Sequence, residues 1–242
     1  MKNDLKEGKG ILYYDQEEVN VIKYEGDYKN NIKEGNGLIV FKNGDRYDGD
    51  WKNNNMDEKG IYYFNDGNRY EGDFKNNIYN GKGKYYSVND DIYEGEYKDD
   101  KKDGKGILYF ATGNIYKGNL IQNEFEGKGI YYYIHGDHYD GFWKNGNKEG
   151  KGICYYINLG TYKGDWKKDE RDGKGIMAWK NGDKYEGDWK NGERDGKGIM
   201  IWENGDKYEG SWKKDKRDGK GVMYNNTGRI KQGLWEKDKF LN

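Results

Sequence analysis

The sequence predicts an all-β fold, an elongated and twisted antiparallel meander of about ten β-hairpins. Three observations predict it: a 23-residue repeat, a short strand-like apolar run in each repeat, and turn residues directly after that run. The 242-residue chain has no proline and no shift of composition. We therefore expect a single array over residues 1–242, with an irregular first repeat at 1–23, nine full repeats at 24–230 and a partial last repeat at 231–242.

Two sets of positions define the repeat. A motif of tyrosine, charged residue, glycine, any residue and aromatic begins at Tyr24 and recurs every 23 residues as far as Tyr208. A glycine recurs at the same spacing from Gly37 to Gly221, in most copies within Gly-Lys-Gly. Only the first repeat is longer, and we expect an insertion in it near residues 15–20.

Each repeat contains one strand-like run and two connections. In the copy at 185–207, residues 199–202 are all apolar, a run too short for a helix and suited to a strand. Asn204-Gly205 follows directly and predicts a tight hairpin turn. The other connection, residues 190–195, is charged and is expected to be longer.

Antiparallel pairing keeps the sum of paired residue numbers constant, which fixes the expected register. The glycine and aromatic columns then share one face, and each ring covers the backbone of a glycine. For the strand at residues 196–202, the pairs expected with the preceding strand are Tyr185–Met200, Gly187–Gly198 and Trp189–Gly196. The pairs expected with the following strand are Trp202–Tyr208, Met200–Gly210 and Gly198–Trp212.

The aromatic face is expected to form a groove that is floored by glycine and walled by rings. Two roles stay open for the rings: the core of a single-layer sheet, or a surface that a partner covers. On the opposite face we expect an ion pair between Asp188 and Lys197. The rings singled out for partner binding are Tyr162, Trp166, Trp179, Tyr185, Trp189, Trp202, Tyr208 and Trp212.

Charge is nearly balanced, with 43 Lys and Arg against 44 Asp and Glu, which argues against a nucleic-acid binder. Basic residues are in excess only toward the C-terminus. There we expect weak contact with anionic lipid at most. The candidate lipid contacts are Lys167, Lys168, Arg171, Lys190, Arg194, Lys213, Lys214, Lys216 and Arg217.

No catalytic residue set is found, so we expect no enzyme, and Gly-Lys-Gly falls on strands rather than at the helix start that phosphate binding needs. His135, His138 and Cys154 are candidate metal ligands. Both histidines occupy turn positions that hold Asn or Lys in other repeats, so no metal or cofactor is predicted. The single cysteine and the lack of a long apolar segment indicate a cytoplasmic protein.

The repeat at 185–192, Tyr-Glu-Gly-Asp-Trp-Lys-Asn-Gly, with Arg-Asp-Gly-Lys-Gly at 194–198, resembles the MORN repeat, the membrane occupation and recognition nexus. The resemblance covers nearly the whole chain. It implies a non-enzymatic scaffold or protein-interaction rod of the cytoskeleton, cell cortex or cilium, associated with cytoskeleton or membrane. The alternatives are a phosphoinositide or anionic-membrane-binding module, and a regulatory array that acts on a separate enzyme chain.

The C-terminal edge of the sheet predicts self-association. The last half repeat, Gly233-Leu234-Trp235, is expected to have no second strand, and an unpaired edge invites another chain. We therefore expect a homodimer through the C-terminal repeats. The alternative is a monomer in which residues 236–242 fold back over this edge.

Overall fold

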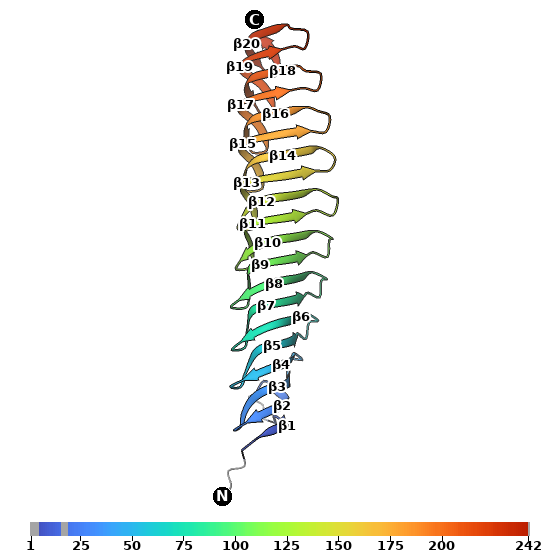
Figure 1. The fold of residues 1–242 in the computed structure, drawn as a ribbon, viewed down its shortest axis with the longest axis vertical. Helices are drawn as coiled ribbons and strands as arrows, with labels where there is room; N and C mark the ends of the chain where they lie inside the picture. The colour runs from blue at the N-terminus through green and yellow to red at the C-terminus, as the bar shows by residue number, and fades with distance from the viewer. Residues whose placement is uncertain (1–4, 16–18, 242) are drawn as a thin grey trace. The chain divides into compact units, whose positions relative to one another are not determined.

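The computed structural model describes residues 5–15 and 19–241, which are built of strands and short turns with no helix among them (Figure 1). The chain divides into two compact units, Met1–Asn123 and Glu124–Asn242, here called the first and second units. Within each unit, every strand pairs antiparallel with the next strand along the chain. The predicted all-β antiparallel meander of hairpins is confirmed.

The described part of the first unit contains ten strands. The predicted insertion near residues 15–20 falls in the connection between the first two of them, and its residues 16–18 lie outside the described ranges. The strands are β1 (Gly8–Tyr13), β2 (Val21–Lys29), β3 (Ile32–Phe41), β4 (Arg46–Lys52), β5 (Asn55–Tyr63), β6 (Arg69–Lys75), β7 (Ile78–Tyr86), β8 (Ile92–Lys98), β9 (Lys101–Tyr109) and β10 (Ile115–Ile121).

The second unit contains eleven strands. They are β11 (Glu124–Tyr132), β12 (His138–Lys144), β13 (Asn147–Tyr156), β14 (Gly160–Lys167), β15 (Glu170–Trp179), β16 (Lys184–Lys190), β17 (Glu193–Ile201), β18 (Lys207–Lys213), β19 (Lys216–Tyr224), β20 (Ile230–Glu236) and β21 (Lys239–Leu241).

The lengths of the two connections differ from the prediction. Lys190 pairs with Glu193, so the connection expected to be longer is a two-residue turn. Its residues have φ values of 49° at Asn191 and 83° at Gly192, as a type I′ turn requires. The Asn204-Gly205 connection is the longer one, because the Trp202 amide bonds to the Asp206 carbonyl oxygen (2.9 Å) around three residues.

On one side of β17, two of the three predicted pairs are confirmed. Tyr185 pairs with Met200 and Gly187 with Gly198. Trp189 lies opposite Arg194 rather than Gly196, because a β-bulge between Gly187 and Trp189 shifts the register.

On the other side of β17 the predicted register is wrong by two residues. The expected pairing enclosed five residues between Trp202 and Tyr208, whereas the turn that forms encloses three between Trp202 and Asp206. The observed pairs, in place of the three expected ones, are Met200–Tyr208, Gly198–Gly210 and Gly196–Trp212.

Aromatic rings over glycines form the core. Tyr185 is 0% exposed, and its ring covers Gly187 and Gly198 so closely that a Cβ on either would clash with it. Trp189 is 4% exposed and meets the Tyr185 ring edge to face at 5.2 Å. The predicted covering of glycine backbone by rings is therefore confirmed.

The same rings join each hairpin to the preceding one. Trp189 also meets Tyr162 edge to face at 5.3 Å, and its Nε1–H donates to the Gly175 carbonyl oxygen at 3.2 Å. The Tyr185 hydroxyl donates to the Asp188 carbonyl oxygen at 2.9 Å inside its own hairpin. Burial of one repeat thus depends on its neighbour, as in other repeat proteins.

The last half repeat does have a second strand, contrary to the prediction. β21 pairs with the end of β20, with Phe240 opposite Trp235 and the two rings 5.2 Å apart. The fold-back expected as the alternative is thus present at residues 239–241. Among the described residues it pairs with Leu234–Glu236 and leaves the start of β20 unpaired on this side.

Candidate functional site

The structure places most of the rings predicted to bind a partner in the core. Six of them, Tyr162, Trp166, Tyr185, Trp189, Tyr208 and Trp212, are at most 4% exposed. Trp179 and Trp202 are half-buried beside the three-residue turns. Packing explains these rings fully, and their binding role stays a prediction.

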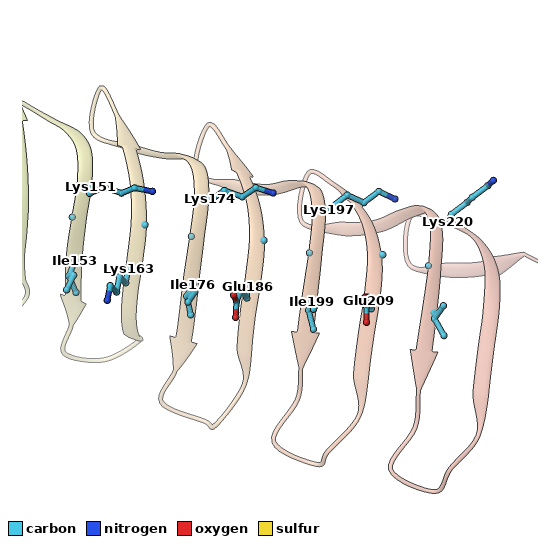
Figure 2. Close-up of a pocket in the computed structure, with 18 of the residues that line it drawn as sticks. Lys151, Ile153, Lys163, Lys174, Ile176, Glu186, Lys197, Ile199, Glu209 and Lys220 are labelled. Carbon is cyan, nitrogen blue, oxygen red and sulfur yellow. The ribbon is translucent and has the colours of Figure 1, made fainter.

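A groove lies on the opposite face of the second unit, where Figure 2 shows lysines in a row on one side and, on the other, isoleucines together with Lys163, Glu186 and Glu209. Its floor is glycine backbone and its volume is about 1780 Å³. We call it the lysine groove. Its rows are Lys128, Lys151, Lys174, Lys197 and Lys220 on one wall, and Ile153, Ile176, Ile199 and Val222 on the other.

The prediction of a glycine floor is confirmed. The predicted ring walls are wrong, and so is the predicted face, because the groove lies on the face opposite the rings. In Gly196-Lys197-Gly198-Ile199, side chains alternate between the two faces, so Lys197 and Ile199 share one face with Gly198 between them. On the other face the Tyr185 ring fills the space over Gly198. The glycine backbone is therefore bare only on the lysine side.

The predicted ion pair between Asp188 and Lys197 is wrong. The Asp188 carboxylate pairs with Lys174 of the preceding repeat, and its Oδ2 accepts the Lys197 backbone amide at 2.7 Å. Burial acts to raise the pKa of Asp188, but the bonds from Lys174 and the Lys197 amide outweigh it and hold the pKa below its usual range. This carboxylate both neutralises a groove lysine and satisfies an amide beside the β-bulge.

Three of the predicted lipid contacts pack between neighbouring repeats, and a lipid role stays a prediction for them as well. The Arg194 guanidinium lies 4.5 Å from the Trp212 ring centroid and 5.6 Å from that of Tyr185, and its Nε is 2.9 Å from Asp215 Oδ1. Arg171 and Arg217 occupy the same position in their repeats and also lie over Trp rings. These side chains are therefore engaged in packing. The other six candidates, Lys167, Lys168, Lys190, Lys213, Lys214 and Lys216, are exposed at or beside the two-residue turns, and a lipid role stays a prediction for them.

Turn carboxylates and amides form a ladder that sequence reasoning missed. Asp215 Oδ1 accepts the Arg194 amide at 3.0 Å, while the Asp215 amide donates to the Arg194 carbonyl oxygen. At the other edge, Asp206 Oδ1 accepts the Asn226 amide at 2.8 Å. The signal was present in the sequence, since Asn or Asp recurs at both turns in most repeats.

The candidate metal ligands have other contacts. His135 Nε2 lies 3.1 Å from Asp137 Oδ2, and the His138 ring stacks on Tyr155 at 4.3 Å. Cys154 is buried in the core, and burial raises the pKa of its thiol. Across residues 5–15 and 19–241, no group of three or more His, Cys, Asp or Glu could hold a metal ion. In the same ranges no helix is long and apolar enough to cross a membrane.

Stacked hairpins of one length, with rings that cover glycines and a groove behind them, define a β-hairpin repeat protein. The sequence profile described as MORN repeat matches ten segments, and the chain belongs to this family. The matched residues are 1–16, 24–46, 47–69, 70–92, 93–115, 116–137, 139–161, 162–184, 185–207 and 208–228.

No curated protein shows significant sequence similarity to the chain. Among solved structures, the TCP10 domain of Danio rerio CPAP is 14% identical with a TM-score of 0.46, over 81% of this chain and 93% of that one. The SAS-4 (dCPAP) TCP domain of Drosophila melanogaster, in complex with a proline-rich motif of Ana2 (dSTIL), is 15% identical with a TM-score of 0.40, over 64% and 84%. Scores below 0.5 carry no functional inference.

Proposed function

We propose that the protein is a non-enzymatic scaffold that binds another protein along the lysine groove. The observation that carries this proposal is the groove itself, which crosses strands from β11 to β20. Its glycine floor lets a partner's backbone approach closely, and its two walls differ in chemistry. Such a surface suits an elongated occupant rather than a small molecule.

The expected setting is the cytoskeleton, the cell cortex or the cilium. This expectation comes from family membership, since proteins with MORN repeats are associated with cytoskeleton and membrane. Near-balanced charge supports a protein partner over a nucleic acid.

A photocrosslinking residue placed in the groove tests the proposal. Benzoylphenylalanine at position 176, in the groove, should give a discrete adduct with a partner protein in the source cell. The same residue at position 204, on an exposed turn outside the groove, is the matched control. Ile153→Lys with Ile199→Lys should remove the adduct, and this pair should fold because Lys84 occupies the equivalent position in the first unit. Equal adducts at 176 and 204, or adducts unaffected by the two lysines, would contradict the proposal.

We also propose a homodimer through the C-terminal repeats. β21 pairs with only three of the seven residues of β20, and Ile230 is 62% exposed at the start of that strand. A second copy pairing along residues 230–233 would cover this edge. Light scattering over a range of concentrations tests for the dimer. A mass that stays at that of one chain would contradict it. If the dimer forms, Ile230→Lys should lower the mass to that of one chain.

A further inference from the structure

We propose that the C-terminal end of the lysine groove binds an acidic peptide segment in the polyproline II conformation. Two of its carboxylates, three residues apart, would lie on Lys197 and Lys220. This inference rests on the proposed scaffold function and specifies the partner's chemistry.

Charge across the groove changes along its length. In β13–β16 the two lysines of the lysine wall each have a carboxylate directly opposite, with Lys151 Nζ 2.6 Å from Asp165 Oδ1 and Lys174 paired with Asp188. In β17–β20 the same positions hold Ser211, opposite Lys197, and Leu234, opposite Lys220.

These two lysines are therefore uncompensated. Lys197 Nζ donates to the neutral Ser211 hydroxyl at 2.8 Å, and neither ammonium has a carboxylate within 4.0 Å in the described part of the chain. The aliphatic wall carries Lys163, Glu186, Glu209 and Gln232 in this order, and the Glu209 carboxylate is paired with Lys207 at 2.9 Å. At this end both lysines therefore lack a carboxylate partner, which favours an anionic occupant.

The spacing of the groove lysines matches that of one side of a polyproline II helix. Successive groove lysines are two strands apart, or about 10 Å at ~4.8 Å per strand. A polyproline II helix has three residues per turn and rises ~3.1 Å per residue, so positions i and i+3 lie ~9.3 Å apart on one side. A β-strand presents one side every ~6.8 Å, and an α-helix needs about seven residues to cover the distance. Polyproline II therefore matches the lysine spacing best.

The glycine floor of the groove offers few free backbone groups to which a β-strand could bond. Gly198 and Gly210 pair with each other, and Gly221 pairs with Gly210 and Gly233, so this backbone is already engaged in the sheet. A polyproline II peptide needs no ladder of backbone hydrogen bonds. Its apolar residues between the carboxylates would contact Ile199 and Val222 on the opposite wall.

Peptide binding to the full chain tests the spacing. Fluorescein-labelled (Pro-Pro-Glu)5 should bind in fluorescence anisotropy, and (Pro-Pro-Gln)5 should bind at least about tenfold more weakly. A peptide of the same composition with its five glutamates at every second residue, so that no two are three apart, should also lose affinity. Equal binding of this peptide would overturn the inference.

Matched lysine variants locate the site. The double variant K197Q/K220Q should lose about tenfold in affinity for (Pro-Pro-Glu)5, because it removes both uncompensated charges. K151Q/K174Q, which removes two compensated lysines from the same wall, should lose less than about threefold. The opposite ranking would overturn the proposal.

Restoring the missing carboxylates gives a variant that is expected to fold. S211D/L234D recreates the pairs that Lys151 and Lys174 already make, so its melting temperature should not fall. Its affinity should fall about as far as that of K197Q/K220Q. Binding equal to that of the unmodified chain would overturn the proposal.

A library of random 15-residue peptides separates this inference from the proposed function. Selection uses the unmodified chain, with counter-selection on Ile153→Lys with Ile199→Lys. Groove-dependent binders without acidic residues three apart would overturn the inference and leave the scaffold proposal standing, whereas an absence of groove-dependent binders would contradict both. If phosphatidylserine vesicles bind only when Lys197 and Lys220 are present, the site binds lipid and the peptide proposal is overturned.

Discussion

The phenol ring of Tyr185 lies over the Cα of Gly198 across the hairpin of β16 and β17, with no room for a Cβ between them. The same contact recurs along each unit, between Tyr47 and Gly60 and between Tyr139 and Gly152. A single-layer sheet has no second layer to pack against. The ring and the glycine together provide its burial.

Substitution of this glycine should destabilise the fold. We expect Gly198→Ala to cost about 2 kcal/mol, because the added methyl would displace the buried Tyr185 ring. Urea denaturation followed by circular dichroism measures the change in the free energy of unfolding. The control is Gly192→Asn, at a turn position that is open in this repeat and occupied by asparagine in others, which should change stability by less than about 0.5 kcal/mol. Equal stabilities of the two variants would contradict this account.

The position that Trp51 and Phe74 hold in successive repeats predicts a gain of stability from one substitution. Trp51 Nε1 donates to the Gly37 carbonyl oxygen at 2.8 Å, whereas the equivalent Phe74 has no donor for Gly60. Phe74→Trp should stabilise the first unit by about 1 kcal/mol if the indole fits, and Trp51→Phe should destabilise it by about as much. Thermal melts of both variants check this. A loss of stability from both would show that ring size, rather than the hydrogen bond, governs the column.

Arg194 should contribute to the stability of the fold through its charge as well as its packing. Arg194→Met keeps an unbranched chain, and Met56 occupies the same position in the first unit, so the core stays filled. We expect a loss of about 1–2 kcal/mol from the contacts with Trp212 and Asp215. Denaturation of the variant measures it, and a loss below about 0.3 kcal/mol would show that packing alone matters.

Alkaline pH should unfold the chain. Burial raises the pKa of Tyr185 and of the equivalent Tyr162 and Tyr47 above 10.0, so the folded state favours the neutral phenol. A raised folded pKa gives stability that is fully present below the unfolded value near 10 and is lost as pH rises through the folded value. Phenolate absorbance and circular dichroism should therefore change together above about pH 10. Complete titration of all tyrosines with the sheet intact would contradict this.

Binding to anionic membranes should be weak and sensitive to salt. The exposed lysines at the two-residue turns, such as Lys213 and Lys214, alternate with acidic residues such as Asp215. Sedimentation with phosphatidylserine vesicles should show binding that disappears well below about 0.5 M salt, and K213Q/K214Q/K216Q should reduce it further. Submicromolar, headgroup-selective binding at about 0.15 M salt would favour the membrane function instead.

Much of the fold follows from the sequence, because the repeat gives the same information in almost every copy. The 23-residue spacing fixes the hairpins, and the Gly187–Gly198 pair fixes the face that the rings cover. The length of the two-residue turns could not be predicted from the sequence, because residues such as Lys168 and Asp169 adopt positive φ values without a glycine to mark them. The β-bulge beside Asp188 was hidden for a different reason, because the glycine that adopts a positive φ there, Gly196, belongs to the recurrent Gly-Lys-Gly of the strand.

The candidate site was harder to predict than the fold. Glycine backbone is part of both faces, and only the direction in which Tyr185 leans decides which face stays open. The place of Arg194 over Trp212 depends on two successive repeats at once, so a pattern within one repeat does not reveal it. Pairing of Lys174 with Asp188 likewise crosses from one hairpin to the next.

The ladder of turn residues has a consequence for how such a chain changes in evolution. Asp215 is bound to Arg194 of the preceding repeat, and Asp206 is bound to Asn226 of the following one, so both edges of a hairpin are in register with a neighbour. One inserted or deleted residue in a turn would break these bonds on that edge. Loss or duplication of a whole repeat would restore all of them. The length of the array is therefore expected to change in steps of 23 residues, so that related chains differ in the number of copies rather than in the length of a copy.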